Sequence, residues 1–276
     1  MNKISRTWSL MSECWQILKQ DKRILLFPLI SGICCLLLLA SFAIPLYATG
    51  AWHPPGRHST PAQQVAYYAV LFVFYVCNYF IITFFNAAII GWTALRLGGG
   101  RPTLALGLRM AAARLHLIIA WALVSATVGL IIRIIEDRSD KIGSFVAGLI
   151  GMAWTIISFF VVPVLVLENK GPIKALQEST SLLKRTWGEQ LTSRFSFGLI
   201  FFLLTIPAAA VVALAFVAGG VAVGIIAIVP AVIYVIVLSL VQSALQAIFQ
   251  TVLYMYAQSG QIPSGFDPDT LKGAWS

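Results

Sequence analysis

Long apolar runs separated by short polar segments form the main pattern of this 276-residue chain. About 20 helical residues cross the hydrocarbon core of a membrane, and six runs are near or above that length. The pattern predicts an all-α fold, a polytopic membrane bundle of six transmembrane helices in one domain over residues 1–276. The predicted spans cover approximately residues 24–47, 65–92, 115–132, 142–167, 195–218 and 221–250.

Three polar segments beside these spans have the spacing of amphipathic helices, at approximately residues 3–20, 102–114 and 172–188. In the first, apolar residues recur at steps of four and three, at Ile4, Trp8, Met11, Trp15 and Leu18. Such a face suits a helix in the membrane interface, and it equally suits a helix packed on the protein's own cytoplasmic side. Both interpretations stay open at this point.

The clearest of the three amphipathic helices lies in residues 168–194, a segment with eight charged side chains. Gly171 and Pro172 predict its start, because proline is favoured in the first helical turn. We expect nine basic and tryptophan side chains in or directly beside the three helices to contact lipid headgroups. These are Trp8, Trp15, Arg101, Arg109, Arg114, Lys174, Lys184, Arg185 and Trp187.

Composition and charge agree with a membrane protein. Hydrophobic residues make up 59% of the chain and charged residues 11%, against about 25% charged in soluble domains. The net charge of +9 comes from basic residues clustered between the spans, which favours anionic lipid headgroups as partners over nucleic acid. One side of the predicted topology carries 15 Lys and Arg and the other 4, counted along the sequence. The positive-inside rule then places both termini in the cytoplasm, with the protein in a bacterial inner membrane.

Two sets of residues inside the spans stand out. Residues 142–167 carry a stripe of small side chains that we interpret as the main packing seam, namely Gly143, Ala147, Gly151 and Thr155. Two other spans carry amides at helical spacing, namely Asn78, Asn86, Gln242, Gln246 and Gln250. Buried amides in lipid seek partners on neighbouring helices, so structural pairing is one interpretation and a polar path for a substrate is the other. Pro163 predicts a kink near the end of its span.

No catalytic, metal-binding or cofactor-binding constellation is predicted from this sequence. The four cysteines, Cys14, Cys34, Cys35 and Cys77, lack metal-ligand spacing. No span core contains Asp, Glu, Lys, Arg or His, whereas proton relays and ion-coupled transporters usually need such a residue. No nucleophile and base are paired on any span or loop, so we expect a protein that is not an enzyme.

Several short motifs resemble a known family. They are Phe85-Asn86-Ala87-Ala88, Trp121-Ala122-Leu123, Val162-Pro163-Val164-Leu165, Gly171-Pro172 and Thr186-Trp187-Gly188-Glu189. Together they resemble an uncharacterised family of six-helix bacterial integral membrane proteins, a domain of unknown function. More loosely, the chain is similar to the membrane domain of some bacterial glycerophosphodiester phosphodiesterases. The resemblance implies a fold and a membrane location and no activity.

Two functions remain as expectations. The first is a non-enzymatic membrane protein that organises lipids or protein partners, including further copies of itself, through its basic cytoplasmic helices. The second is a permease or lipid-moving protein that uses an amide-lined path. One continuous cavity lined by the amides favours the second function, and amides paired across tight helix contacts count against it.

Overall fold

Every element in the described part of the chain is helical, which confirms the all-α prediction. The computed structural model describes the backbone of residues 3–48, 60–138 and 141–260, and the side chains in these ranges except those of 3–10, 138, 141–142 and 185–199. The helices are α1 (Lys3–Gln20), η1 (Lys22–Leu25), α2 (Leu26–Ala48), α3 (Pro61–Leu97), α4 (Leu104–Ala113), α5 (Leu115–Arg138), α6 (Lys141–Ile157), α7 (Val161–Pro163), η2 (Val164–Glu168) and α8 (Pro172–Ser259).

Five helical segments in the described residues are long and apolar enough to cross a membrane. They are Lys22–Ala48, Pro61–Leu97, Leu115–Asp137, Gly143–Glu168 and Ile200–Ser259. Large apolar side chains are exposed on them, among them Leu36, Ile44 and Val217. A helical bundle with this surface needs lipid around it, so the chain is a multi-pass membrane protein.

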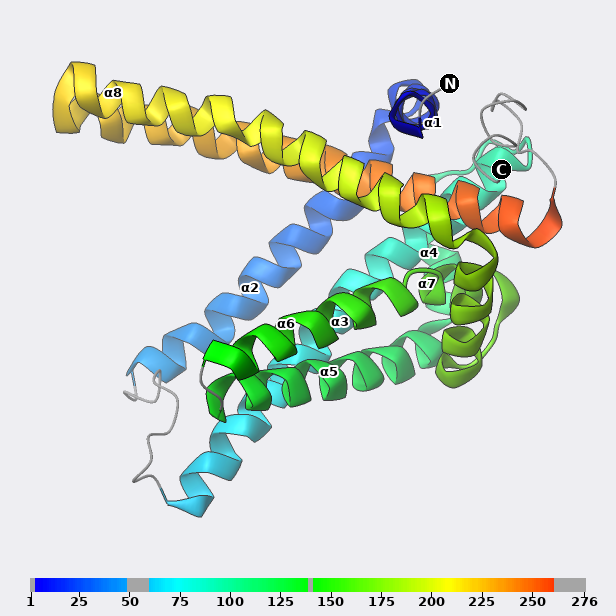
Figure 1. Cartoon of the computed structure of the whole chain (residues 1–276), viewed down its shortest axis with the longest axis horizontal. Helices are drawn as coiled ribbons and strands as arrows, with labels where there is room; N and C mark the ends of the chain where they lie inside the picture. The colour runs from blue at the N-terminus through cyan, green and yellow to red at the C-terminus, as the bar shows by residue number, and fades with distance from the viewer. Residues whose placement is uncertain (1–2, 49–59, 139–140, 261–276) are drawn as a thin grey trace.

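The last of these segments folds back on itself. Gly220 has φ +69° and ψ −172°, a conformation that only glycine adopts readily, and it divides α8 into two arms. The arms lie side by side and antiparallel, yellow and orange in Figure 1, and the Tyr234 hydroxyl donates to the Leu204 carbonyl at 2.9 Å. The count of six spans treats each arm as one span, and that count stays a prediction.

Local sequence explains where the helices begin. Thr60 forms a capping box with Gln63 at the start of α3, and Pro61 occupies the first turn. The Thr103 side chain accepts from the Leu106 N–H at the start of α4. Gly171 precedes α8, with Pro172 in its first turn, as the sequence predicted.

The fourth predicted span, 142–167, matches an apolar segment long enough to cross a membrane, Gly143–Glu168, and its helix is broken near the predicted kink. α6 ends at Ile157, a turn follows, and α7 and the π-helical η2 complete the segment up to Glu168. The break comes just before Pro163. Proline has no N–H for the carbonyl four residues earlier and its ring crowds that carbonyl, so the helical partner of the Phe159 carbonyl is lost.

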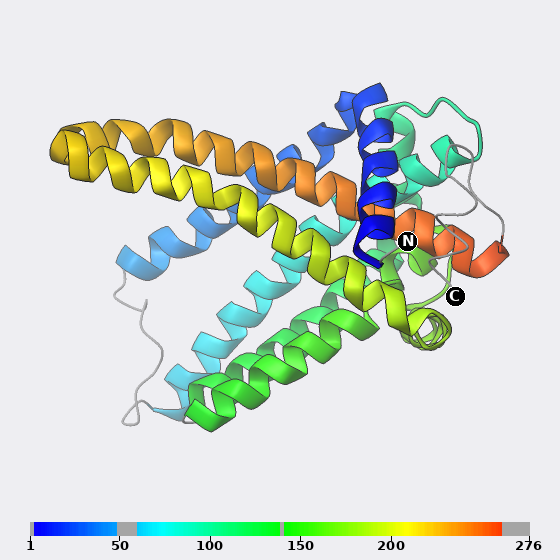
Figure 2. The ribbon, with the colours of Figure 1, turned by 45° about the horizontal axis from the view of Figure 1, so that its top comes forward.

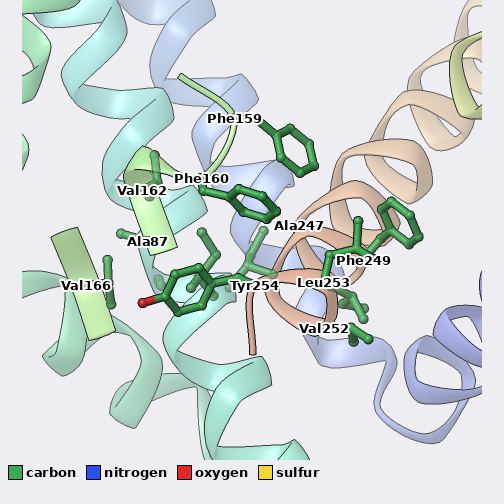
Figure 3. Packing of buried hydrophobic residues seen from close by; sticks show 14 of the residues in the cluster. Ala87, Phe159, Phe160, Val162, Val166, Ala247, Phe249, Val252, Leu253 and Tyr254 are labelled. Carbon is green, nitrogen blue, oxygen red and sulfur yellow. The ribbon is translucent and has the colours of Figure 1, made fainter. Parts of the chain in front are cut away.

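The helices gather at one end of the molecule, where α1, α4 and α7 lie, and diverge from it (Figure 1). We call this end the shared end. At this shared end, α1 lies across the second arm of α8 (Figure 2), with Cys14 and Leu18 buried. The broken segment forms the centre of the core, because Phe160, Val161 and Val164 have no exposed surface. Figure 3 shows the Phe160 ring beside Tyr254 of α8, with ring centroids 6.0 Å apart.

Candidate functional site

A polar cavity of about 380 Å³ lies between α2, α3, α5, α6 and α8, beside the broken segment. Its polar lining residues are Ser31, Tyr79, Thr83, Asn86, Ser125, Thr155, Ser158, Ser243, Gln246 and Gln250. All of these side chains belong to segments that are long and apolar enough to cross a membrane. Asn86 precedes Arg96 at the shared end by ten residues, which is about 15 Å along a helix. The cavity therefore lies between the apolar segments, about 15 Å along α3 from Arg96 at the shared end.

Three of the five amides singled out from the sequence meet at this cavity. Asn86 comes from α3, and Gln246 and Gln250 come from α8. Asn78 and Gln242 are half-buried and do not belong to the lining. Asn86 and Gln246 make no hydrogen bond to another residue in the described part of the chain. The amide pairing expected of structural residues is thus not seen for these two.

Hydroxyl groups and two tryptophans form the rest of the polar and aromatic lining of the cavity. Ser125 and Thr83 are 3% and 5% exposed, and their side chains have no hydrogen-bond partner among the described residues. The indoles of Trp121 and Trp154 stack with centroids 5.5 Å apart and an interplanar angle of 15°. These residues were not predicted from the sequence, because isolated serines, threonines and tryptophans are common in membrane helices.

Two side chains of α8 satisfy the broken backbone beside the cavity. The Gln250 amide nitrogen donates to the Phe159 carbonyl, the group that lost its helical partner. The Ser179 hydroxyl donates to the Ile157 carbonyl at 2.6 Å and accepts from the Phe160 N–H at 3.0 Å. Irregular backbone at membrane depth persists only where protein or water satisfies it, and here protein does so.

A cluster of charged and polar side chains lies where the broken segment ends and α8 begins. The Tyr254 hydroxyl donates to the Glu168 carboxylate, and the Lys170 ammonium lies 2.5 Å from Glu168 and 3.1 Å from Glu178. These hydrogen bonds to Glu168 and Glu178 raise the pKa of Lys170. Asn169, between the two charged residues, adopts a left-handed conformation with φ +56°. The cluster fixes the start of α8 to its second arm.

Exposed cations surround the shared end. Six basic side chains there are exposed and form no ion pair within the described residues, namely Lys22, Arg23, Arg101, Arg109, Lys174 and Lys184. Arg114 is half-buried instead, and its Nε donates to the Val166 carbonyl at 3.4 Å. Trp15 is exposed, with the Lys19 ammonium 5.6 Å from its ring centroid. The predicted headgroup contacts of Trp8, Arg185 and Trp187 lie outside the described side chains.

Only part of the small-residue stripe of α6, predicted as a packing seam, is in close contact with neighbouring helices. Ala147 is fully buried, but a Cβ at Gly151 would still be 3.9 Å from the nearest atom, on Ile132, and Thr155 lines the cavity. A closer approach occurs between α3 and α4, where a Cβ at Gly107 would lie 2.8 Å from the Ala88 carbonyl oxygen.

Residues 65–266 match the family of unknown function DUF6159, and the chain belongs to this family. No curated protein matches the chain. These findings agree with the resemblance to an uncharacterised membrane protein family. They do not show the looser similarity to the membrane domain of glycerophosphodiester phosphodiesterases.

Proposed function

We propose that this member of the family is a permease or lipid-moving protein that binds a polar molecule in the cavity between α3 and α8. One observation carries the proposal: Asn86, Gln246 and Gln250 line a single cavity, and two of these amides have no partner in the described residues. An amide without a partner in a hydrocarbon environment is costly, so water or a ligand has to satisfy it.

Two further features support this function. The cavity volume is within the range of about 300–1,000 Å³ that small-molecule sites occupy. A discontinuous helix borders the cavity, and many secondary transporters build their binding sites at such breaks. The proposal is non-enzymatic and requires no cofactor, since binding and movement need only the polar lining.

We further propose a bacterial inner membrane as the location, with both termini in the cytoplasm. The basic residues whose side chains the structure describes support this orientation, because ten of these residues belong to the shared end and one, Arg133, belongs to the opposite end. Arg133 is also paired there with Glu136 and Asp137, at 3.5 and 3.2 Å. Unpaired cations at the shared end suit the positive-inside rule.

Reconstitution of the full chain into liposomes tests the function. Lipid movement is measured by quenching of a fluorescent lipid in the outer leaflet, and solute entry by vesicle swelling. We expect the double variant Asn86→Leu/Gln246→Leu to lose at least about tenfold in rate, because two polar contacts are removed. The matched control is Asn78→Leu/Gln242→Leu, on the same two helices and away from the cavity. Equal rates for the two double variants, or no movement by the wild-type protein in either assay, would contradict the proposal.

The exposed cations favour a second candidate function, the organisation of anionic lipids and protein partners at the shared end. Six basic side chains without an ion pair lie on η1, α4, α8 and the loop before α4, and they suit anionic headgroups. Native mass spectrometry of the detergent-extracted protein would show whether anionic lipids, protein partners or further copies of the chain co-purify. Replacement of Arg101, Arg109, Lys174 and Lys184 by glutamine should reduce bound anionic lipid, and an unchanged lipid count would exclude this candidate.

A further inference from the structure

Resting on the proposed function, we infer that the cavity binds an uncharged polyol group, such as a sugar ring. The group could belong to the headgroup of a neutral glycolipid or to a free small molecule, and the chemistry of recognition is the same. Three properties of the lining lead to this ligand class: its lack of charge, its balance of donors and acceptors, and its aromatic wall.

Every described residue that lines the cavity is uncharged. A charged ligand taken from water into this part of the bundle would lose its hydration and meet no opposite charge in the lining. That desolvation cost is several times larger for an ion than for a neutral polar group. A neutral ligand is therefore the one that this lining favours.

The polar groups of the lining include both donors and acceptors, so they suit a ligand that both donates and accepts hydrogen bonds. Asn86 and Gln246 each present an amide with both functions, and the hydroxyls of Ser125 and Thr83 do the same. The amide orientation of Gln250 is fixed, because its nitrogen donates to the Phe159 carbonyl. Its oxygen is therefore the atom that can accept a hydrogen bond from a ligand. Each hydroxyl of a polyol is donor and acceptor at once, so a polyol can satisfy all of these groups.

The stacked pair of Trp121 and Trp154 adds a flat apolar wall to the same cavity. A sugar ring has hydroxyls around its edge and C–H groups on its faces. The indole surface that lines the cavity suits the C–H groups, and the amides suit the hydroxyls at the edge. A simple chain of hydroxyls would use the amides and leave the aromatic wall without a partner.

Native mass spectrometry of the full chain with three probes tests the inference. The probes are a monoglucosyl diacylglycerol, free glucose and phosphatidic acid. We expect the wild-type protein to bind a neutral probe, and Asn86→Leu and Gln246→Leu each to bind it about tenfold more weakly. Asn78→Leu and Gln242→Leu should bind like wild type. Binding of the glycolipid alone assigns the site to a lipid headgroup, and binding of free glucose as well assigns it to the sugar itself.

The two ways of failing are distinguishable. If phosphatidic acid binds with the same dependence on Asn86 and Gln246 while both neutral probes do not, the ligand class is wrong and the proposed function stands. If neither leucine variant weakens any probe, both the ligand class and the proposed function are wrong. Size-exclusion chromatography identifies a variant that fails to fold, and the other variant then carries the test.

Discussion

Ser179 is the single side chain on which two groups of the broken backbone depend. It is fully buried, and it bonds both the Ile157 carbonyl and the Phe160 N–H. Ser179→Ala leaves both groups without a partner, and each unsatisfied buried group costs about 1–3 kcal/mol. We expect a loss of at least that size in unfolding free energy, measured by thermal unfolding in detergent. The matched control is Ser181→Ala, an exposed position on the same helix where a change within about 0.5 kcal/mol is expected. Equal unfolding temperatures would show that water replaces the serine.

The reactivity of the Cys14 thiol tests whether α1 packs against α8. It has no exposed surface, and burial raises the pKa of its thiol well above the usual range. Because the thiolate is the reactive form, we expect very slow labelling of Cys14 by a maleimide in a variant without the other three cysteines. Gln16→Cys in a background without Cys14 is exposed on the same helix and should label rapidly. Equal rates would mean that α1 leaves α8 for the membrane interface, the other interpretation that its sequence allows.

At the scale of elements, the close contact between α3 and α4 can be tested by substituting Gly107. A Cβ at Gly107 would lie 2.8 Å from the Ala88 carbonyl oxygen and 3.1 Å from the Phe27 ring. Because backbone cannot yield as a flexible side chain does, Gly107→Ala should cost about 1–3 kcal/mol in stability. Gly148→Ala in α6 meets nothing within 4 Å and should be neutral or stabilising by up to about 1 kcal/mol. Thermal unfolding of both variants checks the pair, and a Gly107→Ala protein as stable as wild type would disprove the close contact.

The helices were predictable from the sequence, and so was a kink near Pro163, but the exact position of the break and the partners of its backbone were not. Uninterrupted apolar runs determine membrane helices, and the run through Phe159 and Phe160 gives no sign that the helix ends there. Pro163 does carry the signal, but the partners of the freed carbonyls are 22 and 91 residues away along the chain. Periodicity grouped five amides on two helix faces, and three of the five line the cavity. Residues eight apart diverge by about 80° around a helix, so Gln242 and Asn78 leave the cavity that Gln250 and Asn86 line.

At the scale of the whole molecule, the hairpin of α8 determines how many times the chain crosses the membrane. Its first arm includes residues 200–219, and these 20 residues alone give about 30 Å of helix, which is enough to cross the hydrocarbon core. A hairpin adds two crossings or none, so the location of the termini cannot distinguish six spans from four. Only the position of its tip can do so.

Single cysteines in a variant that lacks the native four locate this tip. We expect Ala218→Cys at the tip to react with a membrane-impermeant maleimide in intact cells, as Glu136→Cys at the far end of α5 should. Lys184→Cys, at the shared end, should react only after the cells are opened, because the unpaired cations there favour the cytoplasmic side. Labelling of Ala218→Cys together with Lys184→Cys would mean that the hairpin does not cross, and the chain would then have four spans. In that case Gln246 and Gln250 would enter the cavity from a re-entrant helix, and the polar lining would face the shared end alone.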